Sequence, residues 1–134
     1  MVVMANELQN ERGAMPVIFV VDDEPMLLEL AKMTLQPAGY EVRTFEDPRH
    51  ALADYVTAGP PPSLVITDYA MGSMNGLEVM RELRKVNPEQ KIILISGTVD
   101  ERIYANAETQ PDCFFAKPYN PDELVAAVRA LIGG

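Results

Sequence analysis

Five short runs of β-branched and aromatic residues recur along the chain, and a stretch with helical spacing separates each run from the next. Strands that alternate with helices form parallel βαβ units, because parallel neighbours need a long crossover between them. Right-handed crossovers then cover both faces of an open sheet. The pattern therefore predicts an α/β fold, with a doubly wound, five-stranded parallel sheet and five helices. The predicted strands are Val17–Val21, Glu41–Phe45, Leu64–Thr67, Ile92–Ile95 and Cys113–Ala116.

Proline and glycine residues delimit the first three predicted helices. The first helix is expected to begin near Glu24, with Asp23 as its cap, and to end at Pro37-Ala-Gly39. The second is expected to open at Asp47-Pro48 and the third after Asn75-Gly76. The basic residues of the third helix are expected to form a solvated face; they are Arg81, Arg84 and Lys85.

The last two predicted helices differ in how much apolar surface they can bury. The final helix opens with Asn120 as its cap and Pro121 at the first helical position, and Glu123 completes a capping-box pattern. The helix before it has little area to hold it to a core, so we expect it to be short and weakly anchored. Its main apolar positions are Val99, Ile103 and Ala107.

The charge balance and the cysteine count exclude several classes of partner and structure. The chain has 11 Lys and Arg residues against 20 Asp and Glu residues, which gives a net charge of −9. Nucleic acid and anionic lipid require clustered positive charge, so neither is expected as a direct partner. The single cysteine, Cys113, excludes an internal disulfide and fits a reducing compartment.

Length and hydropathy indicate one domain in the cytoplasm. The 134 residues correspond to a single ordinary domain. No apolar run is long enough to span a membrane, and the N-terminus lacks the order of a signal peptide. Residues 1–15 are polar and aperiodic and are predicted to be a flexible leader, followed by the domain over residues 16–134.

Charged and hydroxyl side chains follow four of the five predicted strands. Because ligands bind beyond the carboxyl ends of parallel strands, we expect these side chains to converge. Three carboxylates at short range repel, and their oxygens suit Mg²⁺ or Mn²⁺ better than zinc. Three aspartates, a divalent cation and one lysine sum to −3 + 2 + 1 = 0. The residues concerned are Asp22, Asp23 and Glu24 after the first strand, Asp68 after the third, Ser96 after the fourth and Lys117 after the fifth.

This set of groups suggests phosphoryl chemistry. A metal and Lys117 can neutralise the oxygens of a transferring phosphoryl group, and Ser96 can donate a hydrogen bond to another oxygen. A carboxylate can itself be the nucleophile and form an acyl phosphate. Asp68 is the best placed, since it stands alone at the tip of the central strand.

Four segments in this order resemble the receiver domain of response regulators, the phosphate-accepting module of two-component and phosphorelay signalling. The resemblance covers about residues 16–132 and implies a flavodoxin-like sheet with strand order 2-1-3-4-5. The matching segments are Val20-Val-Asp-Asp-Glu-Pro25, Thr67-Asp-Tyr-Ala-Met-Gly-Ser-Met-Asn-Gly76, Leu94-Ile-Ser-Gly97 and Phe114-Phe-Ala-Lys-Pro118.

The resemblance implies a role for each site residue. Asp68 is expected to be phosphorylated, and Lys117 to bind the phosphoryl group and precede a cis bond to Pro118. Ser96 and Phe114 are expected to form the switch: the hydroxyl moves toward the phosphoryl group and the ring occupies the vacated space. The metal is expected to be bound directly by Asp23, mainly through water by Asp22, and also by Asp68 and the backbone carbonyl of Ala70.

The resemblance also implies the partners and the reaction. A histidine kinase or histidine phosphotransfer protein is expected to dock near the first helix and to present a phosphohistidine. The domain would not be a turnover enzyme but would catalyse its own phosphotransfer. A downstream protein partner is also expected, while a weak homodimer stays open because no sequence feature supports one.

Two positions depart from the family pattern, Gly72 and Phe114, and two others, Ala70 and Thr98, stand where the family tunes the lifetime of the phosphoryl group. Gly72 stands where proline is usual, which should loosen the loop after Asp68. Phe114 has no hydroxyl, so only packing can stabilise its position. Ala70 and Thr98 offer neither a carboxylate nor an amide to position a hydrolytic water, so slow self-hydrolysis of the phosphorylated domain is expected.

Alternatives for the output stay open. The chain is either a stand-alone regulator that binds another protein, a phosphate sink or intermediate in a relay, or the receiver part of a longer regulator with an effector domain. A metal-binding scaffold without phosphotransfer is a fourth possibility. Phe114 also has an alternative role, as a core aromatic that only packs and does not switch.

Overall fold

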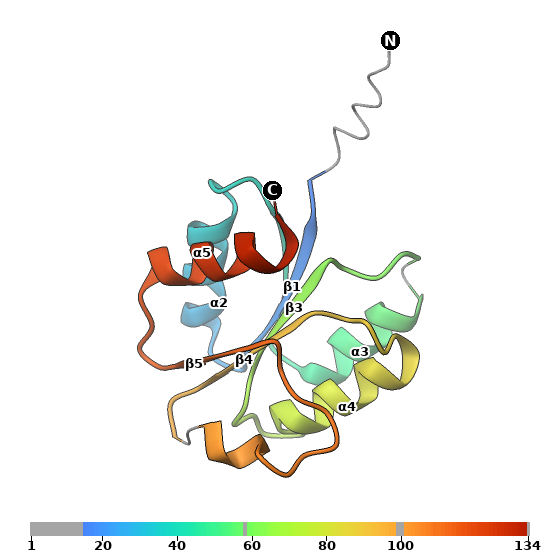
Figure 1. Cartoon of the computed structure of the whole chain (residues 1–134). Helices are drawn as coiled ribbons and strands as arrows, with labels where there is room; N and C mark the ends of the chain where they lie inside the picture. Colours follow the sequence, from blue (N-terminus) through green and yellow to red (C-terminus); the bar gives the residue numbers. More distant parts are fainter. Residues whose placement is uncertain (1–14, 58, 99–100, 134) are drawn as a thin grey trace.

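A computed structural model of the chain describes residues 15–57, 59–98 and 101–133, which form a twisted sheet between two layers of helices (Figure 1). The five strands are all parallel and lie in the order β2-β1-β3-β4-β5. Both features confirm the predicted fold. The strands are β1 (Val17–Val21), β2 (Glu41–Phe45), β3 (Leu64–Asp68), β4 (Ile92–Ser96) and β5 (Cys113–Ala116).

Alternate residues of the strands pack into two separate hydrophobic cores, one on each face of the sheet. In β1, Ile18 and Val20 pack with helices α2 and α5, whereas Phe19 and Val21 pack with helices α3 and α4. Figure 1 shows these two helix pairs on opposite sides of the sheet. The central strands β3 and β4 are buried along their whole length, as expected of a sheet covered on both faces. The helices are α2 (Pro25–Leu35), α3 (Pro48–Thr57), α4 (Gly76–Val86) and α5 (Pro121–Ile132).

Two of the helix caps differ from expectation. The cap of α2 is Glu24, not Asp23, because the residue before a proline is held in an extended conformation, here with φ −101° and ψ 107°. Asn75 caps α4 in a capping box with Glu78, which the sequence reading missed. In α5, Asn120 caps as predicted and accepts hydrogen bonds from the first-turn backbone N–H groups.

The helix expected between β4 and β5 is wrong for the residues that the structure describes there. Between β4 and β5 the described chain holds only one turn of 3₁₀ helix, η2 (Glu101–Tyr104), and Val99 lies outside the described residues. The Gln110 side chain donates to the carbonyls of Tyr104 and Ala107, so these backbone groups are satisfied without a helix. The segment holds few apolar residues whose burial would favour a helix over this loop.

Arg84 holds the second half of this crossover against α4, so the expected solvated helix face is wrong at this position. The guanidinium donates to the carbonyl of Gln90 at 3.0 and 3.1 Å, to Thr109 Oγ1 at 2.6 Å and to Asp112 Oδ2 at 2.9 Å. It also donates to the carbonyl of Gln110. The Arg84 side chain is only 15% exposed, whereas Lys85 is 64% exposed.

Two further expectations concern the ends of the chain and membranes. The predicted leader, residues 1–15, lies outside the described residues except for Met15. None of the helices in the described part of the chain combines the length and apolar character that crossing a bilayer requires.

Candidate functional site

The carboxyl ends of the strands bring together the polar residues that the sequence singled out. Asp68 and Ser96 are the last residues of β3 and β4, while Asp22 and Lys117 directly follow β1 and β5. Asp22, Asp68 and Ser96 are 7%, 6% and 1% exposed. Such burial of polar side chains in an otherwise apolar sheet requires partners for each of them.

Three carboxylates form an oxygen-lined cluster. One oxygen each of Asp22, Asp23 and Asp68 lies within 4.8 Å of the other two. Asp22 and Asp68 are buried and Asp23 is exposed, so the cluster opens to solvent on one side. Asp23, Asp68 and Ala70 line a cavity of about 450 Å³ at this position. An all-oxygen donor set beside open space fits Mg²⁺ or Mn²⁺, which retain water ligands.

Lys117 is the cation that these carboxylates share. Its Nζ lies 3.1 Å from Asp22 Oδ2, 3.2 Å from Asp68 Oδ1 and 3.4 Å from Glu24 Oε1. The backbone places the lysine, since its N–H donates to the carbonyl of Ser96 at 2.8 Å. The peptide bond between Lys117 and Pro118 is cis.

The titration of the site reflects burial first and charge second. Burial raises the pKa of Asp68 to about 6, and the Asp22 charge adds to this while Lys117 opposes it. Burial also raises the pKa of Asp22, although the N–H of Glu24 and the Lys117 ammonium counteract it. Burial lowers the pKa of Lys117, but its bonds and attraction to Asp22 and Asp68 outweigh this, so the net pKa is raised.

Short backbone contacts fix the acidic residues. Asp22 Oδ1 accepts the N–H of Glu24 at 3.0 Å, and the N–H of Asp22 donates to the carbonyl of Phe45 at 3.1 Å. A Cβ on Gly76 would lie 2.6 Å from the carbonyl oxygen of Asp68, so the start of α4 approaches β3 more closely than a side chain permits. The loop between Asp68 and α4 therefore returns tightly to the end of β3.

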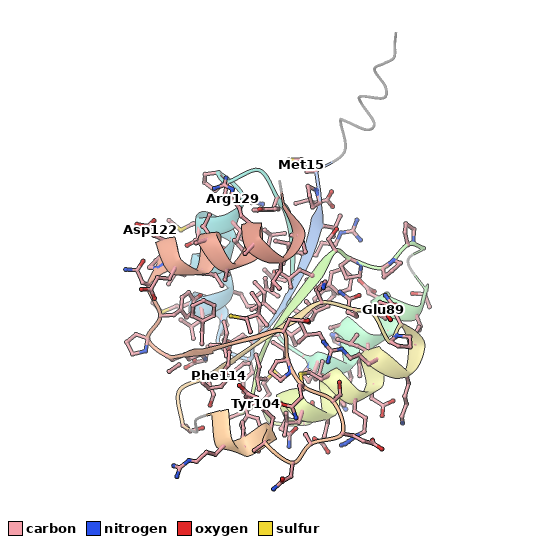
Figure 2. All side chains as sticks on the ribbon, viewed as in Figure 1. Met15, Glu89, Tyr104, Phe114, Asp122 and Arg129 are labelled. Atoms are coloured by element: carbon pink, nitrogen blue, oxygen red, sulfur yellow. The ribbon has the colours of Figure 1, made fainter. Side chains whose placement is uncertain are left out.

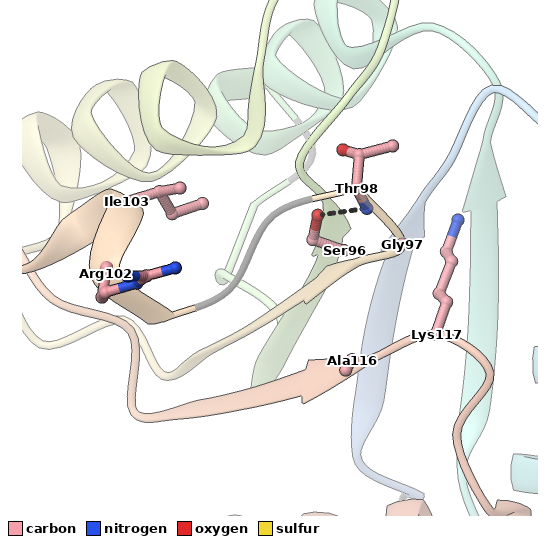
Figure 3. Close-up of a pocket in the computed structure, with 7 residues that line it drawn as sticks. All are labelled: Ser96, Gly97, Thr98, Arg102, Ile103, Ala116 and Lys117. Atoms are coloured by element: carbon pink, nitrogen blue, oxygen red, sulfur yellow. Dashed lines mark hydrogen bonds between the residues drawn. The ribbon is translucent and has the colours of Figure 1, made fainter.

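Ser96 lines a second cavity of about 600 Å³ (Figure 3). Its Oγ accepts the N–H of Thr98 at 3.2 Å. Arg102 and Ile103 of η2 line the far side of this cavity, and Lys117 lines the near side. Gly97, Thr98 and Lys117 line both this cavity and the cavity of Asp23 and Asp68, so the two cavities adjoin next to Ser96.

Phe114 packs against η2. Its ring centroid lies 5.9 Å from that of Tyr104, with the two planes at 50° (Figure 2). Phe114 is half-buried, and in the pairing of β5 with β4 it lies opposite Leu94. The aromatic expected to switch is therefore coupled to the short turn that replaces the predicted helix.

Sequence reasoning missed two contributors at this end of the sheet. It named Glu24 without a role, whereas the Glu24 carboxylate lies 3.4 Å from Lys117 Nζ. It also missed Arg102, whose place depends on the unexpected path of the crossover. Neither placement follows from residue spacing.

Known proteins resemble this chain in sequence. The protein-family model described as the response regulator receiver domain matches residues 18–129 of this chain. A probable transcriptional regulatory protein, TcrX of Mycobacterium tuberculosis, is 33% identical over 122 residues, covering 90% of this chain and 51% of TcrX. The transcriptional regulatory protein AruR of Pseudomonas aeruginosa is 39% identical, covering 87% of this chain and 49% of AruR. The chain thus spans about half the length of the curated relatives it matches.

Solved structures resemble it in fold as well. The response regulator TrrA of Thermotoga maritima, determined in complex with Mg(2+)-BeF, is 39% identical with a TM-score of 0.76, covering 87% of this chain and 99% of TrrA. A receiver domain from Clostridium thermocellum is 28% identical with a TM-score of 0.80, covering 88% of this chain and 94% of that domain. Together with the strand order and the acidic cluster, these matches show that the chain belongs to the response-regulator receiver-domain family.

Proposed function

We propose that this domain accepts a phosphoryl group on Asp68 in a reaction that depends on Mg²⁺ or Mn²⁺. The observation that carries the proposal is the position of the Asp68 carboxylate, 3.2 Å from Lys117 Nζ and in one oxygen cluster with Asp22 and Asp23. A carboxylate between a cation and a metal-binding cluster is placed to attack phosphorus while its neighbours neutralise the phosphoryl oxygens.

The chain's own residues would hold the metal. We assign Asp23 and Asp68 as direct ligands, Asp22 as a ligand mainly through water, and the backbone carbonyl of Ala70 as the last protein ligand. Support comes from the oxygen cluster, and from Ala70, which lines the same cavity as Asp23 and Asp68. A metal bound there supplies positive charge that stabilises the phosphoryl oxygens during transfer.

The transfer itself is a displacement at phosphorus. A carboxylate oxygen of Asp68 forms the new P–O bond, the P–N bond of a phosphohistidine donor breaks, and its electron pair stays on the imidazole nitrogen, which takes up a proton. Lys117 holds one phosphoryl oxygen, and the hydroxyl of Ser96 turns to donate to another. The domain thus catalyses its own modification and is not a turnover enzyme.

The donor would be a histidine kinase or a histidine phosphotransfer protein that docks beside α2. This helix exposes apolar side chains on its outer surface, which is unusual enough for a soluble domain to suggest contact with another protein. The exposed residues are Met26, Leu30 and Met33, at 85%, 41% and 65%.

Phosphorylation would then bias the crossover between β4 and β5. As Ser96 moves toward the phosphoryl group, Phe114 and Tyr104 can repack together, because their rings are already in contact. A change in this coupled pair alters the face built from η2, β5 and α5, which is the surface we assign to a downstream protein. A preference of the phosphoryl group for one of two existing arrangements is sufficient.

The output is either the binding of another protein or, as the second candidate, control of an effector domain in a longer regulator. The second candidate is favoured by relatives of about twice this length, among them the "DNA-binding response regulator MtrA" of Mycolicibacterium smegmatis, which is 34% identical. The net charge of −9 argues against direct contact of this domain with nucleic acid in either case.

Labelling by a small phosphodonor tests the proposal. Wild-type domain incubated with acetyl phosphate and Mg²⁺ should gain one phosphoryl group, and chelation of the metal should prevent it. Asp68→Asn should remain unlabelled, since an amide is too weak a nucleophile. Equal labelling of wild type and Asp68→Asn would contradict the assignment of the acceptor.

A further inference from the structure

A fourth carboxylate reaches the phosphoacceptor site and shifts its charge balance. Glu24 Oε1 lies 3.4 Å from Lys117 Nζ, and both residues line the cavity that holds Asp23 and Asp68. Four carboxylates and one lysine sum to −4 + 1 = −3, so a bound divalent cation leaves −1. Without Glu24 the same sum would be zero.

Glu24 occupies the outer side of the site. Its side chain is 62% exposed, whereas that of Lys117 is 18% exposed. A group that enters this cavity from solvent therefore comes close to the Glu24 carboxylate, which lines it together with Asp68 and Lys117. The residue is fixed at this place because it directly precedes Pro25, the first residue of α2.

The backbone and the side chain of Glu24 act on different partners. Its N–H orients the Asp22 carboxylate at 3.0 Å, and its own carboxylate engages Lys117. A change to the side chain alone thus leaves the hydrogen bond to Asp22 in place. This separation allows the charge of Glu24 to be tested without dismantling the acidic cluster.

We propose that Glu24 sets the ligand preference of the site, favouring the divalent cation and disfavouring anionic phosphoryl groups by holding Lys117. This inference rests on the function proposed above. Lys117 must exchange a carboxylate for a phosphoryl oxygen during transfer, and each anionic donor must approach against the Glu24 charge. Small anionic donors are therefore penalised relative to a protein donor that places a cationic side chain beside Glu24.

The two ligands should respond to Glu24→Gln in opposite directions. Calorimetry should show Mg²⁺ binding weakened by about three- to tenfold, because one negative charge near the cation is lost. Binding of beryllofluoride at saturating Mg²⁺ should tighten by about the same factor, because the competitor for Lys117 is gone. Both shifts should shrink in roughly 0.5 M salt, where exposed charges are screened.

Two matched variants separate this effect from general changes. Glu29→Gln removes one negative charge from an exposed position of the same helix and should leave both affinities within about twofold of wild type. Glu24→Asp keeps the charge and should retain the wild-type order of affinities. Circular dichroism of all variants checks that the fold is intact.

The outcomes distinguish this inference from the function on which it rests. If Glu24→Gln leaves both affinities at the wild-type values, or shifts both in the same direction, the role of Glu24 is wrong and the phosphoacceptor stands. If wild-type domain fails to bind beryllofluoride with Mg²⁺, both the proposed function and this inference fall.

Discussion

At the scale of single residues, the Asp68 carboxylate lies where burial and a neighbouring negative charge disfavour its ionised form. The side chain is 6% exposed and shares a cluster with two other aspartates. Burial and the Asp22 charge raise its pKa to about 6, and Lys117 and the backbone N–H of Tyr69 offset them only in part. In the absence of a metal, the ionised Asp68 side chain therefore lowers the stability of the fold near neutral pH. Reactive groups in functional sites commonly have pKa values shifted in this way.

This gives a pH-dependent prediction for Asp68→Asn. Because the pKa of Asp68 is raised, the folded domain binds its proton more tightly than the unfolded chain does. The free energy of unfolding without metal should therefore fall as the pH rises from about 4 to about 6. Asp68→Asn should remove this loss and be more stable than wild type by about 1–3 kcal/mol at pH 7.5.

Urea unfolding in EDTA at pH 4 and pH 7.5 measures the difference. The difference should largely vanish at about pH 4, where the folded carboxyl group is protonated and about half of the unfolded chains carry the proton as well. Addition of Mg²⁺ at pH 7.5 should stabilise wild type more than the variant, since ligand binding to the folded state adds to its stability. A less stable Asp68→Asn in EDTA at pH 7.5 would refute the prediction.

Gly76 is a second residue whose identity the geometry requires. A Cβ there would lie 2.6 Å from both the Asp68 carbonyl oxygen and Leu94 Cδ1. Gly76→Ala should therefore destabilise the domain by about 1–3 kcal/mol. It should also weaken Mg²⁺ binding, because the backbone that carries Asp68 must shift. Gly72→Ala is the matched control in the same loop, since a Cβ there meets nothing within 4 Å. Equal melting temperatures for both variants would argue against the close approach.

We expect the lifetime of the phosphorylated domain to depend on two small residues beside the site. Ala70 and Thr98 line the cavity next to Asp68, and neither carries a carboxylate or an amide. Without such a group to position a hydrolytic water, we expect slow loss of phosphate after the donor is removed. The decay can be followed by intact mass, and loss of the label within seconds would contradict this expectation.

At the scale of elements, apolar patterning predicted the strands, of which the three inner ones, β1, β3 and β4, are buried at nearly every position. The predicted and observed bounds agree for β1, β2 and β5, while β3 and β4 each extend by one residue. Those extra residues are Asp68 and Ser96, polar groups that an apolar pattern does not include. The functional side chains thus continue the strands, which is why the sheet positions them so firmly.

The crossover between β4 and β5 shows what such patterning cannot supply. Sparse apolar spacing suggested a weak helix, but the observed path depends on one side chain from a distant element. Arg84 of α4 donates to Thr109, Gln110 and Asp112, and the choice between helix and loop follows from these long-range hydrogen bonds. Spacing within the crossover carries no information about them.

Replacing Arg84 should therefore loosen the crossover. Arg84→Gln removes a nearly buried charge from Asp112 and several hydrogen bonds, and should cost about 1–3 kcal/mol. Amide exchange should accelerate at Asp112 and Ile92, which bond to each other through the Ile92 carbonyl and the Asp112 side chain. Arg81→Gln, at an exposed position of the same helix, should change neither quantity. Unchanged exchange at Asp112 in Arg84→Gln would contradict the role of this arginine.

At the scale of the whole molecule, the sheet order assembles the site. Asp22 and Lys117 are 95 positions apart in the sequence, yet their side chains lie 3.1 Å apart because β1, β3, β4 and β5 end at the same edge. The general rule for parallel sheets was enough to predict that the strand-end residues meet. That rule could not predict the contact of Glu24 with Lys117, because the reach of the side chains decides such a contact and the topology does not.

The central claim is that this assembly makes Asp68 the phosphoacceptor, and mapping the phosphoryl group on the intact domain tests it most directly. After reaction with acetyl phosphate and Mg²⁺, mass spectrometry should find one phosphoryl group per chain, on Asp68, in wild type and in Asp54→Asn, a variant at an exposed aspartate of α3. No label should appear in Asp68→Asn or in the presence of EDTA. A phosphoryl group on any other residue of the wild-type chain, or labelling that persists in Asp68→Asn, would contradict the claim.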